Sequence, residues 1–154
     1  MSIWFFINII VFIFAIWKIT TGYINLPIIF GGLGFILVLY NWTRHAVFST
    51  IRSNISRERK VKLAQFSKKV LPYHKWTGSL ALVLILTHFI FITHYYEFTI
   101  HSAKMLSGLF AFMILILMVS SGWLRFFKTT YAIRLLHLTL GFCLFISVII
   151  HLIL

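Results

Sequence analysis

The chain has 154 residues, of which 61% carry hydrophobic side chains and only 10% are charged. Soluble domains are about 45–50% apolar and about a quarter charged, so this composition excludes an ordinary water-soluble domain. Lys and Arg number 14 against 2 acidic residues, a formal charge of +12. Such a balance points to nucleic acid in a soluble protein. In a membrane protein it is the usual enrichment of basic residues in cytoplasmic loops, and we expect no nucleic-acid partner.

Five apolar runs each predict a transmembrane helix, because a bilayer core needs about 20 apolar residues per crossing. The runs cover residues 3–17, 24–42, 76–96, 105–124 and 132–154. The predicted fold class is all-α, an integral membrane bundle of five transmembrane helices that forms a single domain over residues 1–154. We expect a multi-pass protein of the cell membrane (plasma or inner membrane). Nothing basic precedes the first run and no small-residue cleavage site follows it, so we expect it to stay attached.

The polar segment 43–75 carries most of the positive charge and is predicted to be a basic cytoplasmic loop. Residues 125–134 then lie on the same side, which collects twelve of the 14 basic residues and leaves only Lys18 and Lys104 outside. This arrangement predicts a cytoplasmic N-terminus and an outer C-terminus. Residues 52–69 are either a solvated loop or an amphipathic helix on anionic headgroups.

Four histidines form two pairs with one shared interval. His74 and His88 are 14 residues apart in the third apolar run, and His137 and His151 are 14 apart in the fifth. Fourteen helical residues turn through about 1400°, about 40° short of four turns, and rise about 21 Å, so each pair shares a face at two heights. The third and fifth helices run in the same direction. His74 and His137 therefore lie near the cytoplasm, and His88 and His151 lie towards the outer face.

This arrangement predicts two b-type haems, each bound by two imidazoles. Two axial imidazoles leave no open iron position, which suits electron transfer. Gly78 and Gly141 follow the inner histidines His74 and His137 by four residues. On a helix this is the same-face neighbour, where glycine makes room for a macrocycle. A single intramembrane histidine can instead hydrogen-bond across helices. A tetrahedral metal site is less plausible, because the layers are far apart and no Cys or carboxylate lies beside them.

Other polar residues near these helices admit two interpretations each. Lys75 and Arg134 flank the inner ligands and either pair with the inner haem propionates or only set the topology. His94 and His101 lie in the outer connection, which either binds an acceptor or a metal ion or supports the outer propionates, or is an ordinary interfacial turn. His45 is most simply an interfacial residue.

Three segments resemble the ferric reductase-like transmembrane domain. They are HKWTGSLALVLILTH at 74–88, SSGWLRFF at 120–127 and RLLHLTLGFCLFISVIIH at 134–151, and the similarity covers about residues 40–154. The family includes ferric-chelate reductases, NADPH oxidases and the haem subunit of the bacterial methionine sulfoxide reductase system. The resemblance implies that the four histidines ligate two b haems. It also implies electron flow from a cytoplasmic reduced flavin or nicotinamide donor to an acceptor beyond the membrane.

The chain departs from the larger members of that family, which add a sixth helix and a flavin and nicotinamide domain. It ends three residues after His151 and has no G-x-G-x-x-G fingerprint. We therefore expect an oxidoreductase subunit without catalytic residues of its own, served by a separate flavoprotein. An acidic flavoprotein would be steered to the basic segment 43–75.

Two other functions stay open at this point. A quinol-linked or superoxide-oxidising cytochrome b predicts a quinone pocket beside one haem and activity without a flavoprotein. A non-redox haem or metal transporter, or an assembly protein, predicts haem that is sub-stoichiometric or readily exchanged.

Overall fold

The computed structural model describes residues 2–154, which contain helices and turns but no strand. All five helices are long and apolar enough to cross a membrane. They are α1 (Ile3–Thr21), α2 (Leu26–Arg52), α3 (Arg57–Tyr96), α4 (Ala103–Phe127) and α5 (Tyr131–Ile153). The predicted all-helical architecture with five candidate crossings is confirmed.

The prediction of a loop over residues 43–75 is wrong. Residues 43–52 complete α2, residues 57–75 begin α3, and only residues 53–56 connect the two helices. Charged residues are good helix formers, so their presence ends the apolar run without ending the helix. The alternative of a helix within residues 52–69 is closer to the structure, although this helix continues without a break into the apolar part of α3.

Side-chain caps fix where several helices begin. The side-chain carbonyl oxygen of Asn25 accepts a hydrogen bond from the Ile28 amide at 3.1 Å, and the Ser102 and Thr130 hydroxyls cap α4 and α5 in the same way. Such caps satisfy amide groups that have no partner inside the helix. The helix starts are thus set by short polar residues directly before the apolar runs.

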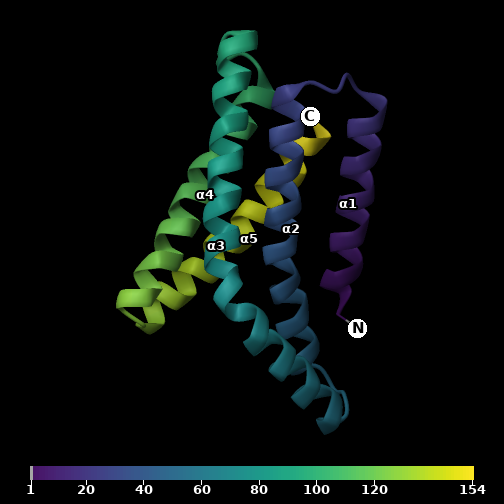
Figure 1. Ribbon diagram of the computed structural model, residues 1–154, viewed down its shortest axis with the longest axis vertical. Coiled ribbons are helices and arrows are strands. Elements are labelled where there is room, and N and C mark those ends of the chain that lie inside the picture. The colour runs from purple at the N-terminus through teal and green to yellow at the C-terminus, as the bar shows by residue number, and fades with distance from the viewer. Residues whose placement is uncertain (1) are drawn as a thin grey trace.

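Helix α3 is the longest element, with 40 residues. At about 1.5 Å per residue it spans about 60 Å, twice the roughly 30 Å of a bilayer core. Pro72 lies inside it, where its ring removes one helical hydrogen bond and bends the helix. The lower part of α3 leans away from the upper part (Figure 1). The histidine pair of α3 begins directly after this bend, at His74.

The helices pack mainly as two antiparallel hairpins, α2 with α3 and α4 with α5, and α1 lies against α2 at the edge (Figure 1). Two buried apolar clusters hold them together. The first joins α1, α2 and α5 through Val11, Ala15, Phe35, Leu39, Trp42 and Phe145. The second joins α2, α3, α4 and α5 through Val38, Ala81, Ile114, Leu115 and Leu144. Helices α2 and α5 belong to both clusters and so connect them.

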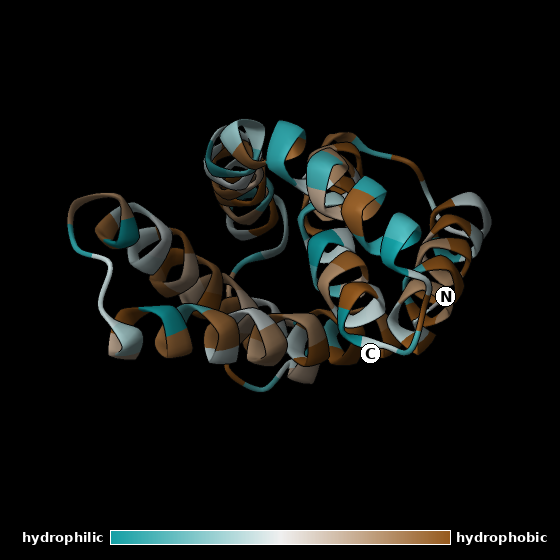
Figure 2. Cartoon of the chain, turned by 90° about the horizontal axis from the view of Figure 1, so that it is seen from below, coloured by the Kyte–Doolittle hydropathy of each residue, from teal (hydrophilic) through white to brown (hydrophobic). Residues whose placement is uncertain are grey.

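The outside of the bundle is apolar, as a lipid-facing surface should be. Val83, Ile90 and Phe110 expose 56%, 54% and 62% of their surface, and similar residues recur on every helix. The N-terminus and the turns at 53–56 and 128–130 lie towards one end of the molecule, and the C-terminus lies towards the other (Figure 1). Seen from the end that carries the N-terminus, hydrophilic helical segments gather on the α2–α3 hairpin (Figure 2).

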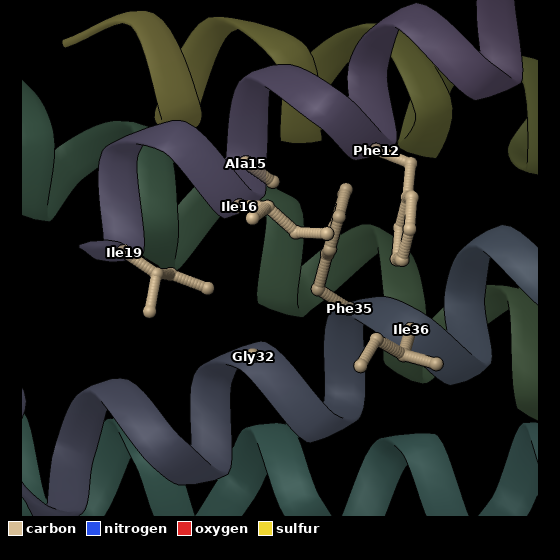
Figure 3. Close-up of a pocket in the computed structure, with 7 residues that line it drawn as sticks. All are labelled: Phe12, Ala15, Ile16, Ile19, Gly32, Phe35 and Ile36. Atoms are coloured by element: carbon tan, nitrogen blue, oxygen red, sulfur yellow. The ribbon is translucent and has the colours of Figure 1, made fainter. Parts of the chain in front are cut away.

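A small cavity of about 80 Å³ lies between α1 and α2 (Figure 3). Its wall is formed only by apolar residues, including Phe12 and Ile16 of α1 and Gly32 and Phe35 of α2. No histidine borders it. The cavity therefore has no group that would ligate a metal, and the candidate site lies elsewhere.

Candidate functional site

The site is built on α3 and α5, which carry the four predicted histidines at two heights. We call His74 with His137 the first layer and His88 with His151 the second layer. In the first layer the two ring centroids are 6.3 Å apart, and the ring planes are inclined at 85°. The structure thus brings the predicted partners His74 and His137 together in the first layer. In the second layer, the pairing of His88 with His151 stays a prediction.

The spacing in the first layer fits two imidazoles on opposite sides of one metal ion. A metal–imidazole bond is about 2.0–2.1 Å long and the ring centre lies about 1.1 Å beyond the nitrogen, so two opposed ligands place their centroids about 6.3 Å apart. The observed separation of His74 and His137 is 6.3 Å. The centroid separation is thus the one that two opposed ligands of one metal ion would show.

Both second-layer histidines are anchored through Nδ1. His88 Nδ1 donates to the Pro27 carbonyl oxygen at 2.7 Å. His151 Nδ1 lies 3.1 Å from the Lys104 carbonyl oxygen and 3.1 Å from Ser107 Oγ. A carbonyl oxygen can only accept, so the proton belongs on Nδ1 in each ring. This tautomer leaves the Nε2 lone pair for a metal, the arrangement that second-shell partners commonly impose on histidine ligands.

The first-layer histidines differ from each other in their support. His137 Nδ1 lies 3.1 Å from the Met118 carbonyl oxygen and 3.0 Å from Ser121 Oγ, and so repeats the pattern of the second layer. His74 Nδ1 is buried and has no hydrogen-bond partner among residues 2–154. A buried polar atom without a partner is costly and rare in a folded protein. His74 therefore lacks, within the described residues, the Nδ1 support that the other three rings have.

Helix α4 supplies the anchors with the same interval as the histidines. Ser107-Gly108 and Ser121-Gly122 are 14 residues apart in the sequence. The serines reach His151 and His137, and a Cβ added at Gly108 or Gly122 would lie 2.9 or 3.3 Å from the same two rings. Our sequence reasoning missed this repeated Ser-Gly pair, although its interval matches that of the histidines.

A third glycine supports His88 from α2. A Cβ added at Gly31 would lie 2.8 Å from His88 Nδ1. The glycines that allow histidine rings to pack are therefore Gly31, Gly108 and Gly122, which lie on α2 and α4 rather than on the helices that carry the ligands.

The two glycines predicted to make room for a macrocycle have different surroundings. A Cβ at Gly78 would meet nothing within 4 Å, so this position faces open space one turn beyond His74. A Cβ at Gly141 would lie 3.7 Å from Met118 Sδ and 3.9 Å from Trp42, which are ordinary contacts. The role of both glycines stays a prediction.

An apolar plug separates the two layers. Ala81 lies seven residues from both histidines of α3, and Leu144 lies seven from both histidines of α5. The two side chains are 1% and 2% exposed and belong to one buried cluster. Seven residues are about two helical turns, so the plug lies midway on the histidine face. Each layer is thus a separate site.

Lys75 and Arg134, the cations predicted to flank the first layer, lie in different surroundings from each other. The Lys75 ammonium lies over the rings of Trp123 and Phe126, at 4.3 and 4.5 Å from their centroids. Such positions attract a cation through the ring quadrupole. Arg134 is exposed in the first turn of α5. No hydrogen bond joins either side chain to a histidine within residues 2–154, and their role stays a prediction.

The remaining histidines lie outside both layers. His94 lies in the last turn of α3 and His101 lies in the connection to α4, and both are exposed. His45 stacks on Trp42 with centroids 4.8 Å apart, inside a cluster that includes Trp4. Among residues 2–154, no three His, Cys, Asp or Glu side chains come together as a metal site.

The arrangement fits a planar metal macrocycle better than a bare ion. Each layer offers two imidazoles, with Nε2 free on the three anchored rings, and open space adjoins the first layer at Gly78. A macrocycle supplies the other four metal ligands itself, so two protein ligands per layer suffice. No family model, no curated protein and no solved structure matches this chain.

Proposed function

We propose that this protein is a dihaem b-type membrane cytochrome that carries electrons across the membrane. The observation that carries the proposal is the first layer, where two imidazoles on separate helices lie 6.3 Å apart between ring centroids. The second layer repeats the arrangement with ligand rings held by backbone carbonyl groups. The resemblance to the ferric reductase-like transmembrane domain supports the same function.

Haem supplies one-electron chemistry at a potential that its axial ligands and surroundings tune. The protein contributes position and rigidity. Hydrogen bonds from Nδ1 fix the rings of His88, His137 and His151, so these ligands need little rearrangement when the charge at the metal changes. The plug at Ala81 and Leu144 keeps polar groups out of the space between the layers.

The direction of electron flow follows from the charge distribution. Basic residues of multi-pass proteins collect on the cytoplasmic side, and twelve of the 14 basic residues lie in segments 43–75 and 125–134. The first layer is then the cytoplasmic one. Its donor is a reduced flavin-linked or nicotinamide-linked protein that docks on the basic end of the α2–α3 hairpin, and the acceptor lies beyond the second layer. The protein is an oxidoreductase subunit of the cell membrane.

Haem quantification and a reduced-minus-oxidised spectrum of the purified chain test this function. We expect two low-spin b haems per chain. His74→Ala or His137→Ala should remove one haem, and His88→Ala or His151→Ala the other, so that a variant with one change from each layer binds none. His101→Ala is a matched control, because its exposed side chain lies outside both layers. Full haem content in all four single variants would refute the assignment.

The geometry of the first layer predicts a spectroscopic signature as well. If His74 and His137 held a haem iron with their planes inclined at 85°, the two iron orbitals that interact with the rings would be nearly equal in energy. The oxidised first-layer haem should therefore give a strongly anisotropic low-spin EPR signal, and this signal should vanish in His74→Ala. A rhombic signal typical of parallel rings would contradict the observed geometry.

A further inference from the structure

Two arginines on different helices lie at the first layer, and the first is Arg44 of α2. Asn41 Oδ1 accepts a hydrogen bond from Thr77 Oγ1 at 2.9 Å, which aligns these residues of the antiparallel pair α2 and α3. Three residues further along α2 and three residues back along α3, Arg44 comes opposite His74. The helix register thus places a guanidinium beside the first layer.

The second arginine comes from α4. Ser121 Oγ is 3.0 Å from His137 Nδ1, and Arg125 follows Ser121 by one turn on the same face. The charge of Arg125 acts electrostatically on both first-layer histidines, as does that of Arg44, and the two arginines also act on each other. The helix register thus places two guanidinium-bearing residues at the level of the first layer.

Nothing in the described chain neutralises these charges. Glu58 pairs with Lys62 at 2.6 Å, and Glu97 lies at the far end of α3. Arg44 Nε is buried and has no hydrogen-bond partner within residues 2–154. An unpaired buried nitrogen on a charged group is costly, so the site is short of an anion with acceptor oxygens.

We propose that Arg44 and Arg125 bind the two propionate carboxylates of the first-layer haem. The proposal rests on the dihaem function and deepens it. Guanidinium and carboxylate form paired, charge-assisted hydrogen bonds, which suit a half-buried arginine. A haem carries two propionates, and the layer offers two guanidiniums. Lys75, which the sequence also offered for this role, lies 4.3 and 4.5 Å from the ring centroids of Trp123 and Phe126, whereas the Arg44 guanidinium lies 5.6 Å from that of Phe48.

The test compares haem with its dimethyl ester, which lacks both carboxylate charges. Apoprotein carrying His88→Ala and His151→Ala takes haem only at the first layer. We expect it to bind haem about ten-fold more tightly than the diester, or more, because charge-assisted hydrogen bonds are lost with the ester. Arg44→Gln with Arg125→Gln should abolish this preference while the affinity for the diester changes little. Arg-to-Lys changes at both positions should retain part of it.

Lys128→Gln is the matched control, because it removes an exposed charge at the same end of the molecule, and the preference should persist. Equal affinity for haem and diester before the arginines are changed would overturn the proposal. So would a preference that survives the double glutamine change, or a loss that weakens both haem forms equally. If the double glutamine variant does not fold, two results still test the proposal. They are the affinity of the starting protein for haem against the diester, and the same comparison in the double lysine variant. Failure of the starting protein to bind either form contradicts the dihaem function itself, which is a different result.

Discussion

At the scale of single residues, substitutions at two glycines test two different roles. Gly108 allows a histidine ring to pack, and Gly78 is predicted to leave room for a macrocycle. A Cβ at Gly108 would lie 2.9 Å from His151 Cε1, so Gly108→Ala should displace the ring and lower haem occupancy of the second layer. Gly78→Ala meets nothing within 4 Å. It should leave the apoprotein as stable or more stable by about 0.5–1 kcal/mol, because alanine favours helix. Haem binding at the first layer should nevertheless fall, because the methyl group would enter the space for the macrocycle.

Thermal unfolding of the apoprotein and haem titration check both variants. Full first-layer occupancy in Gly78→Ala would place the macrocycle on another side of His74. Gly122→Ala gives an intermediate case, since its Cβ would lie 3.3 Å from His137 and a small shift of the ring relieves the contact.

That two histidines share one face of α3, and two share one face of α5, could be predicted from the sequence, because the 14-residue interval fixes the helix face. The groups that support the histidine rings could not be predicted. Ser and Gly are common in membrane helices, so the repeated pairs at 107–108 and 121–122 gain meaning only once α4 is known to lie against α5. The Pro27 carbonyl, which holds His88, carries no sequence signal at all.

At the scale of helices, the N-terminal part of α3 projects charge away from the apolar bundle. Neutralising Arg57, Arg59 and Lys60 with glutamine should slow reduction by the flavoprotein donor by about ten-fold at low salt, because electrostatic steering raises association rates by about 10-fold or more. The effect should shrink as salt rises and screens the charges. Stopped-flow reduction across ionic strengths measures both.

Replacing the same two arginines by lysine is the control, because it keeps the charge and should keep the rate. A glutamine variant reduced at the unchanged rate at low salt would show that the donor docks elsewhere. Haem content should be the same in all these variants, since the changed residues lie at least 14 positions before His74.

The sequence predicts that the five helices exist better than it predicts where they end. Five apolar runs predicted five helices correctly, because hydrocarbon favours only backbone that satisfies its own hydrogen bonds. The ends were misplaced wherever a helix leaves the apolar region. Hydropathy changes at Lys75, whereas α3 begins at Arg57, directly after the cap residue Ser56 that closes the 53–56 turn.

At the scale of the whole molecule, the two layers stand about 21 Å apart along helices that would cross a bilayer core about 30 Å thick, which would put each layer near one face. In the proposed function, electrons would therefore cross most of the barrier within the protein, and the sidedness of the bundle would decide which face receives them. The same twelve-to-two distribution of basic residues that sets the proposed orientation also sets the proposed docking end.

Cysteine labelling in intact cells tests the orientation. Cys143 is the one cysteine of the sequence and is exposed, so Cys143→Ala gives a background without thiols. Asn54→Cys marks the 53–56 turn and Thr99→Cys marks the connection from α3 to α4, and both positions are exposed. A membrane-impermeant maleimide should label Thr99→Cys from outside and reach Asn54→Cys only after the cells are opened. The reverse pattern would place the first layer outside. The basic hairpin would then face an external donor, and electrons would have to enter the cell rather than leave it.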